Sequence, residues 1–177
     1  MQVIISTFIS LLLSSSALVA AVPLSKRDVT TVLADLSQIS SDVAAITSIA
    51  ATYDGDPFQS ITLATDVQTL ENDITKTTSD TSSSSAFTDD QAQQILSSVT
   101  SLAPSITTLL NDLVAKASTF ASAGLTSLVH DNLQTLQSET DSLFTATEAN
   151  VPSDDASSFA SLQTTIDDAF TQAIAAF

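Results

Sequence analysis

The chain has 177 residues, a length that fits one domain. All 20 acidic residues lie at or beyond Asp28, where Lys76 and Lys116 are the only two basic residues, so this part carries a net charge of −18. Such a charge repels phosphate backbones and anionic membranes, and it excludes nucleic acid as a partner. There is no cysteine, so the fold must hold together by packing alone.

Residues 1–21 have the layout of a secretory signal peptide. An apolar run around Phe8 to Leu13 leads to Val19 and Ala21, small residues at the −3 and −1 positions of a cleavage site. The alternative is a membrane anchor. However, the serines at 14–16 interrupt the run, and a spanning helix needs roughly 20 apolar residues. We therefore expect secretion and no transmembrane anchor.

Residues 22–27 resemble a short propeptide that ends in the dibasic pair Lys26-Arg27. A Kex2-type protease of the Golgi cleaves after such pairs, which would make Asp28 the first residue of the mature chain, 28–177. The alternative is a chance pair in a flexible leader. Processing is favoured because basic residues are so scarce in the rest of the chain.

Apolar residues recur at three- and four-residue steps from residue 28 to 52 and from 57 to 78, which predicts two amphipathic helices. Asp28 is suited to the N-cap of the first and Pro57 to the first turn of the second. Between them, the run from Tyr53 to Pro57 predicts a turn; it lacks the further acidic ligands of a calcium loop.

A low-complexity stretch rich in serine and threonine, residues 77–85, predicts a mobile loop and a candidate region for O-glycosylation. A capping-box pattern at Thr88–Gln91 then opens a helical segment that reaches Phe120. Pro104 lies inside it, so the segment is either one kinked helix or two helices. Two further helical segments follow over 125–150 and 153–177. The predicted fold is all-α, an antiparallel bundle of four to five amphipathic helices.

Residues for catalysis are not apparent in the sequence. There is no G-x-S-x-G motif, and His130 is the only histidine, so a nucleophile would lack a recognisable base. The pairs Asp89-Asp90 and Asp154-Asp155 fall at predicted helix starts, where the helix dipole favours them, and Asp167-Asp168 is expected to be solvated. One histidine and no cysteine argue against zinc. We expect neither an enzyme nor a metal or other cofactor.

Apolar residues in the middle of each helical face are the candidates for a binding site, because ligand sites in bundles form between inward faces. The alternative is that they form an ordinary core. The candidates for the lining of an apolar tunnel are Leu36, Val43, Leu70, Leu110, Leu113, Leu136, Phe144, Leu162 and Phe170.

The mature part resembles the fungal hydrophobic surface-binding protein A family, which includes the cell wall galactomannoproteins. The resemblance is carried by the signal peptide with Lys26-Arg27, the opening Asp28-Val29-Thr30 that continues to Ile46, the Tyr53–Asp56 break and the run from Leu96 to Leu113. It implies binding to hydrophobic surfaces or to fatty acids in a central tunnel, with recruitment of a secreted esterase as a linked role, and no catalytic residues.

Two features refine what this resemblance implies. The C-terminus, Ala173 to Phe177, lacks the spacer and hydrophobic tail of a GPI signal, so a released extracellular monomer is expected. The competing interpretation is a structural, O-glycosylated mannoprotein associated with the cell wall, in which the glycans carry the function.

Overall fold

A computed structural model describes residues 28–177. The predicted signal peptide and propeptide, with Ala21, Lys26 and Arg27, lie outside the described residues. Within the described range the chain forms six helices and no β-strand: α1 (Val29–Thr52), α2 (Pro57–Ser82), α3 (Asp89–Ala115), α4 (Ala117–Ser122), α5 (Thr126–Glu148) and α6 (Ser153–Ile174). None of these helices is long and apolar enough to cross a membrane.

The first three helices begin where the capping residues of the sequence place them. The carboxylate of Asp28 accepts a hydrogen bond from the backbone N–H of Thr31 at 3.1 Å, so Asp28 is the N-cap of α1. Pro57 occupies the first turn of α2, behind the N-cap Asp56. Both hydrogen bonds of the predicted capping box between Thr88 and Gln91 are present at the start of α3.

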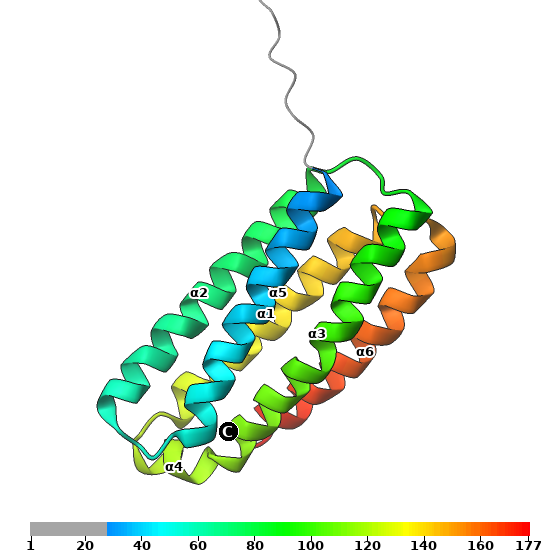
Figure 1. Ribbon diagram of the computed structural model, residues 1–177. Coiled ribbons are helices and arrows are strands. Elements are labelled where there is room, and N and C mark those ends of the chain that lie inside the picture. Colours follow the sequence, from blue (N-terminus) through cyan, green and yellow to red (C-terminus); the bar gives the residue numbers. More distant parts are fainter. Residues whose placement is uncertain (1–27) are drawn as a thin grey trace, which may run out of the picture.

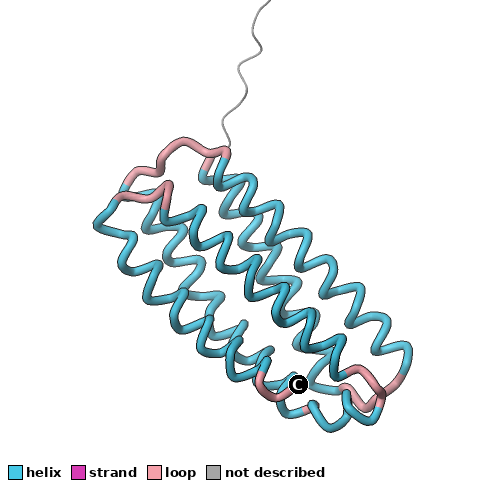
Figure 2. Tube along the Cα trace, turned by 180° about the vertical axis from the view of Figure 1, so that it is seen from behind, coloured by secondary structure: helices cyan, strands magenta, loops and turns pink. Residues whose placement is uncertain are grey.

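The five long helices form a closed ring (Figure 1; Figure 2). Around the ring, α1 packs against α2, α2 against α5, α5 against α6, α6 against α3 and α3 against α1, and no pair among the described helices packs across the centre. The short α4 lies at the end of the bundle where α3 finishes and α5 begins. The predicted helical bundle is therefore correct, although its helix count of four to five is one too low when α4 is included.

Helix directions differ from a simple antiparallel arrangement. The consecutive pairs α1–α2 and α5–α6 are antiparallel hairpins, as the colours along the chain show (Figure 1). The neighbours α1–α3, α2–α5 and α3–α6 run parallel (Figure 1). The reason is that two connections join long helices that are not neighbours in the ring: α2 to α3, and α3 through α4 to α5.

Two expectations at the level of helices are settled by these boundaries. Pro104 lies inside one helix, α3, rather than between two. The mobile loop predicted over residues 77–85 is wrong up to Ser82, because α2 continues through Thr77 and Thr81 and buries both. Burial against the bundle outweighs the weak helix propensity of threonine and serine here.

The outer faces of the helices carry hydroxyl groups that bond to their own backbone. On five different helices, Ser41, Thr62, Ser98, Thr135 and Ser161 each donate to the carbonyl four residues earlier, at 3.0–3.1 Å. Such back-bonding is common for helical serine and threonine. The polar surface is therefore covered largely with hydroxyl groups rather than with long charged side chains.

An aromatic cluster closes the α4 end of the bundle. The rings of Tyr53 and Phe120 stack with centroids 4.3 Å apart, and Phe120 meets Phe177 edge-on at 5.8 Å. Lys116 extends over this cluster and donates to the backbone carbonyl of Tyr53 at 3.0 Å. The cluster joins the end of α1, the helix α4 and the end of the chain.

Candidate functional site

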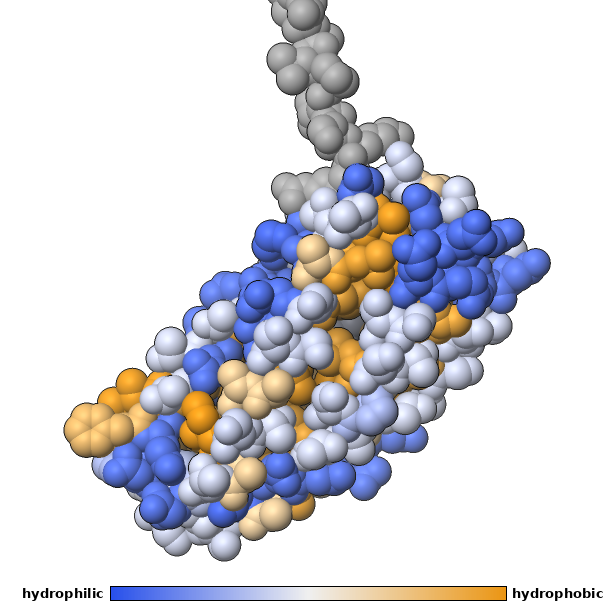
Figure 3. Space-filling model, viewed as in Figure 1, coloured by the Kyte–Doolittle hydropathy of each residue, from blue (hydrophilic) through white to orange (hydrophobic). Residues whose placement is uncertain are grey.

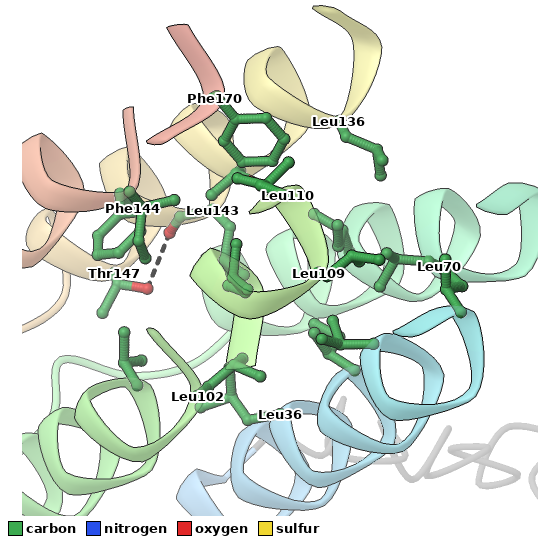
Figure 4. Close-up of a pocket in the computed structure, with 18 of the residues that line it drawn as sticks. Leu36, Leu70, Leu102, Leu109, Leu110, Leu136, Leu143, Phe144, Thr147 and Phe170 are labelled. Atoms are coloured by element: carbon green, nitrogen blue, oxygen red, sulfur yellow. Dashed lines mark hydrogen bonds between the residues drawn. The ribbon is translucent and has the colours of Figure 1, made fainter. Parts of the chain in front are cut away.

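A cavity runs through the middle of the ring, lined by side chains from α1, α2, α3, α5 and α6 (Figure 4). All its lining residues are apolar except Thr140 and Thr147, both on α5. The space between atoms totals about 910 Å³ when the openings to solvent are included. Its lining residues are spread along much of the length of α1, α3 and α5, so the cavity is elongated.

The length of the cavity follows from the helix that borders it. On α1 the lining extends from Val32 to Ile46. These fourteen steps at about 1.5 Å each give a path of about 21 Å. A space of this shape matches an extended alkyl chain better than a compact ligand.

The structure brings together eight of the nine predicted tunnel residues. Leu36, Val43, Leu70, Leu110, Leu113, Leu136, Phe144 and Phe170 all line the cavity. Leu162 does not; it is partly buried at the edge of the core on α6. Whether these residues contact a ligand stays a prediction.

Other lining residues were not among the predicted ones. They include Val32, Ile39, Ile95, Val99, Leu102, Ile106, Leu109, Leu133, Leu143, Phe159 and Ile166. Their three- and four-residue spacing marks them as inward-facing in the sequence, but spacing does not distinguish the cavity wall from solid core. The prediction, which took residues from the middle of each helical face, therefore covered only part of the cavity wall.

The cavity wall carries no charged group. Lys76 lies outside it and pairs with Asp35 and Asp80, which raises the pKa of its ammonium group. Lys116 is held at the aromatic cluster. Of the two polar lining residues, Thr147 already donates to the carbonyl of Leu143 at 2.8 Å (Figure 4). A ligand inside the cavity would therefore be held almost entirely by hydrophobic contacts.

A second cavity adjoins the first between the N-terminal halves of α2 and α5. The two cavities adjoin at five residues that line both of them: Ile46, Val67, Leu113, Leu133 and Leu136. The second cavity also contains polar lining groups, Ser60 and Asn132.

The polar residues considered for chemistry lie away from both cavities. His130 contacts only its neighbour Asp131, at 3.2 Å on the surface of α5. Asp167 is partly buried instead of fully solvated as expected. Burial and the nearby Asp141 carboxyl raise its pKa to about 6. Among residues 28–177, no group of three or more potential metal ligands is close enough to hold an ion.

A ring of helices around an uncharged apolar cavity defines a binding protein for hydrophobic ligands. The family model described as hydrophobic surface binding protein A matches residues 29–149, and the chain belongs to this family. No curated protein sequence matches the chain.

Solved structures share the fold. The structure of AFMP4P in complex with palmitic acid has 36% sequence identity and a TM-score of 0.83, over 84% of this chain and 99% of that one. Ligand binding domain 2 of the Penicillium marneffei MP1 protein, complexed with multiple arachidonic acids, has 20% identity and a TM-score of 0.79, over 86% and 97% of the two chains. Domain 1 of the same protein, complexed with arachidonic acids, has 17% identity and a TM-score of 0.78, over 85% and 97%.

Proposed function

We propose that this protein is a secreted, non-enzymatic carrier that binds a long-chain fatty acid with the acyl chain in the central cavity. The observation that carries the proposal is a cavity about 21 Å long with an apolar wall and no charge. The palmitic acid complex of AFMP4P, 36% identical, supports the same class of ligand.

Hydrophobic contact supplies the affinity. Burial of each CH₂ group contributes about 0.8 kcal/mol, so the roughly fifteen alkyl carbons of a sixteen-carbon acid contribute about 12 kcal/mol before the cost of ordering the ligand. The carboxylate finds no cation in the wall and stays at a cavity mouth, in water or near hydroxyl and amide groups. Affinity therefore depends on chain length more than on the charge of the headgroup.

Adsorption to hydrophobic solids is a linked role that family membership supports. Recruitment of a secreted esterase to such solids is a further part of the proposal. The competing role is structural, as an O-glycosylated cell wall mannoprotein, with Ser82, Ser83 and Ser85 as exposed acceptors beyond the buried Thr77 and Thr81. Enzymatically deglycosylated protein that still binds fatty acid argues against glycans as the functional part.

The test is a titration of fatty acids of increasing length, and of the matching alcohols, against residues 28–177, with native mass spectrometry to identify any co-purified lipid. We expect affinity to rise with chain length in both series. The variant Val43→Phe fills part of the cavity and should lower affinity for the longest chains at least tenfold, which corresponds to about 1.4 kcal/mol. The matched control Val114→Phe, at an exposed position on α3, should bind like the wild type.

Val43→Phe can also cost about 1–3 kcal/mol of stability through overpacking, so its folding must be verified by circular dichroism. Affinity that ignores chain length contradicts the proposal. Equal binding by a folded Val43→Phe variant contradicts the location of the acyl chain in the central cavity.

A further inference from the structure

The side chains at the interface between α2 and α5 differ between its two ends. Toward their C-terminal halves, Glu71 and Thr75 of α2 face Glu139 of α5, with Thr75 donating to Glu139 at 3.4 Å. Toward the N-terminal halves, the α2 side chains that line the second cavity are the small Ser60 and Ala64 together with Leu63 and Val67. The second cavity therefore lies at this end of the α2–α5 interface.

The second cavity lies between the surface of the molecule and the central cavity. Its lining starts at exposed or half-exposed residues, Ala64, Leu128 and Asn132, and continues inward to the five residues shared with the central cavity. The aromatic cluster of Tyr53, Phe120 and Phe177 closes the end of the bundle beside it. A ligand that leaves the central cavity toward this end therefore meets an apolar lateral path at the α2–α5 seam.

Exposed apolar side chains cluster around this mouth. Four large apolar residues of the described chain are exposed: Phe58 (80%), Ile61 (64%), Leu128 (48%) and Val114 (37%). Leu128 lines the second cavity, and Phe58 and Ile61 lie in the first turns of α2, next to Ser60. Figure 3 shows apolar side chains on the surface at the end of the molecule where α2 begins. Such a cluster on a water-soluble chain indicates a contact surface for a hydrophobic partner.

The polar groups at the mouth suit the passage of an amphiphile. The Ser60 hydroxyl is already engaged, with the Asp56 carbonyl at 3.0 Å and the Tyr53 hydroxyl at 2.8 Å. The Asn132 carboxamide makes no hydrogen bond to another described residue, so its N–H donors are available at the mouth. A carboxylate held there keeps its contact with water while the chain lies inside.

We propose that the α2–α5 mouth is the portal through which an acyl chain enters and leaves the central cavity, and that Phe58, Ile61 and Leu128 seat this portal on an electrically neutral acyl-lipid surface. The inference rests on the proposed function. The partner is a neutral surface because the net charge of −18 repels anionic lipid. The portal thus takes chains directly from aggregated lipid instead of from dilute monomers.

A plug at the portal tests the route. Ala64→Trp places a large ring on the α2 side of the mouth, at a residue that lines the second cavity and not the central one. We expect stopped-flow association and dissociation rates of a fluorescent fatty acid to fall together by roughly tenfold, because a blocked path slows both directions. The ratio of the two rates, and hence Kd, should change less than about twofold. Ala160→Trp, at an exposed position on α6, is the matched control and should leave both rates unchanged.

Rates equal to those of the wild type in the Ala64→Trp variant overturn the portal. So does a weaker Kd with an unchanged association rate, because that result makes the mouth part of the resting site instead of a path. If the wild type itself binds no fatty acid, the proposed function fails, and this outcome is distinct from failure of the portal.

The role of the exposed apolar residues at the mouth is tested by measuring the transfer of fatty acid from lipid vesicles to the protein. The double variant Phe58→Ser with Ile61→Ser removes the two most exposed apolar side chains at the mouth, neither of which lines the central or the second cavity. We expect transfer of fatty acid from phosphatidylcholine vesicles to slow about tenfold, while Kd for the monomeric fatty acid is retained. Val114→Ser is the control and should transfer like the wild type. An unchanged transfer rate in the double variant, or wild-type transfer that is equally fast from phosphatidylglycerol vesicles, overturns the seating on neutral lipid.

Discussion

Asp167 of α6 faces Asp141 of α5 across a helix–helix seam. Asp141 accepts a hydrogen bond from Gln163 at 2.8 Å, whereas one carboxyl oxygen of Asp167 is buried without a hydrogen-bond partner. Burial, together with the adjacent Asp141, raises the pKa of Asp167 from 3.8 to about 6. A proton held between the two carboxyl groups would satisfy this oxygen, so the pair is best accommodated when it is protonated.

The sign of the stability effect follows from this shift. A carboxyl group with a raised pKa in the folded state stabilises the fold at low pH, below its unfolded value of 3.8, and loses that contribution as the pH rises through about 6. Asp167→Asn imitates the protonated form, so we expect it to be more stable than the wild type at pH 8 by roughly 1 kcal/mol, after allowance for solvent screening. At pH 4 the two should differ by less than about 0.5 kcal/mol.

Urea denaturation at pH 4 and pH 8 measures the effect of Asp167→Asn. The matched control is Asp168→Asn, the exposed neighbour, which should show a smaller difference between the two pH values. An Asp167→Asn variant that is less stable than the wild type at pH 8 contradicts this account.

At the scale of single helices, α3 combines a helix-breaking residue with a wall of the cavity. Pro104 is exposed, while Leu102 and Ile106 on either side of it line the central cavity. The proline has no N–H to donate to the carbonyl of Thr100. The hydroxyls of Thr107 and Thr108 donate to the carbonyls of Ala103 and Pro104 at 3.1 and 2.9 Å, and these bonds do not replace the one that the Thr100 carbonyl lacks.

Replacement of Pro104 by alanine should stabilise the protein. An interior proline costs about 3 kcal/mol relative to alanine in a helix, so we expect a gain of about 1–3 kcal/mol. The midpoint of urea denaturation measures it. Ser105→Ala, at the next exposed position, should shift the free energy of unfolding by less than about 0.5 kcal/mol. A midpoint that is unchanged in Pro104→Ala would show that α3 is not strained at the proline.

Helix starts were predictable because capping residues act locally. Asp28, Pro57 and the Thr88–Gln91 box depend only on residues within one turn, and all three occur as expected. The end of α2 was not predictable in this way. Thr77 and Thr81 have weak helix propensity, and they are helical because the bundle buries them. Local capping patterns fix where a helix begins, while tertiary contacts decide how far a segment of weak helix propensity remains helical.

At the scale of the whole molecule, the cavity is a consequence of the number of helices in the ring. Helix axes pack about 8–10 Å apart, which puts the centre of a ring of five about 7–8.5 Å from each axis, against about 6–7 Å for a square of four. Leucine and valine side chains do not fill the larger space completely. Inward-facing residues could be predicted from their spacing, as Leu36 and Phe144 show. The order of the helices in the ring depends on long-range packing, which the spacing does not reveal, so the sequence alone could not predict the cavity.

Overall charge governs how the whole molecule meets a hydrophobic solid. Self-repulsion at a net charge of −18 opposes a dense adsorbed layer, and it declines as the pH approaches the pI of about 4.1. We expect retention on phenyl-substituted beads to increase from pH 8 to pH 4.5, and added salt at pH 8 to act in the same direction. Circular dichroism at each pH verifies that the helices persist. Retention that weakens on acidification contradicts this mechanism.

The hydroxyl groups on the outer helix faces have a consequence for dehydration. Ser41, Thr62, Ser98, Thr135 and Ser161 have already committed their single donor hydrogen to a backbone carbonyl. When water is removed from such a face, no hydroxyl donor loses its partner, so the desolvation penalty that an unpaired donor would carry does not arise. A surface of lysine and glutamate would have to strip water from full charges instead. The hydroxyl-covered parts of the surface therefore lose their water at a lower cost than the parts that carry the exposed carboxylates.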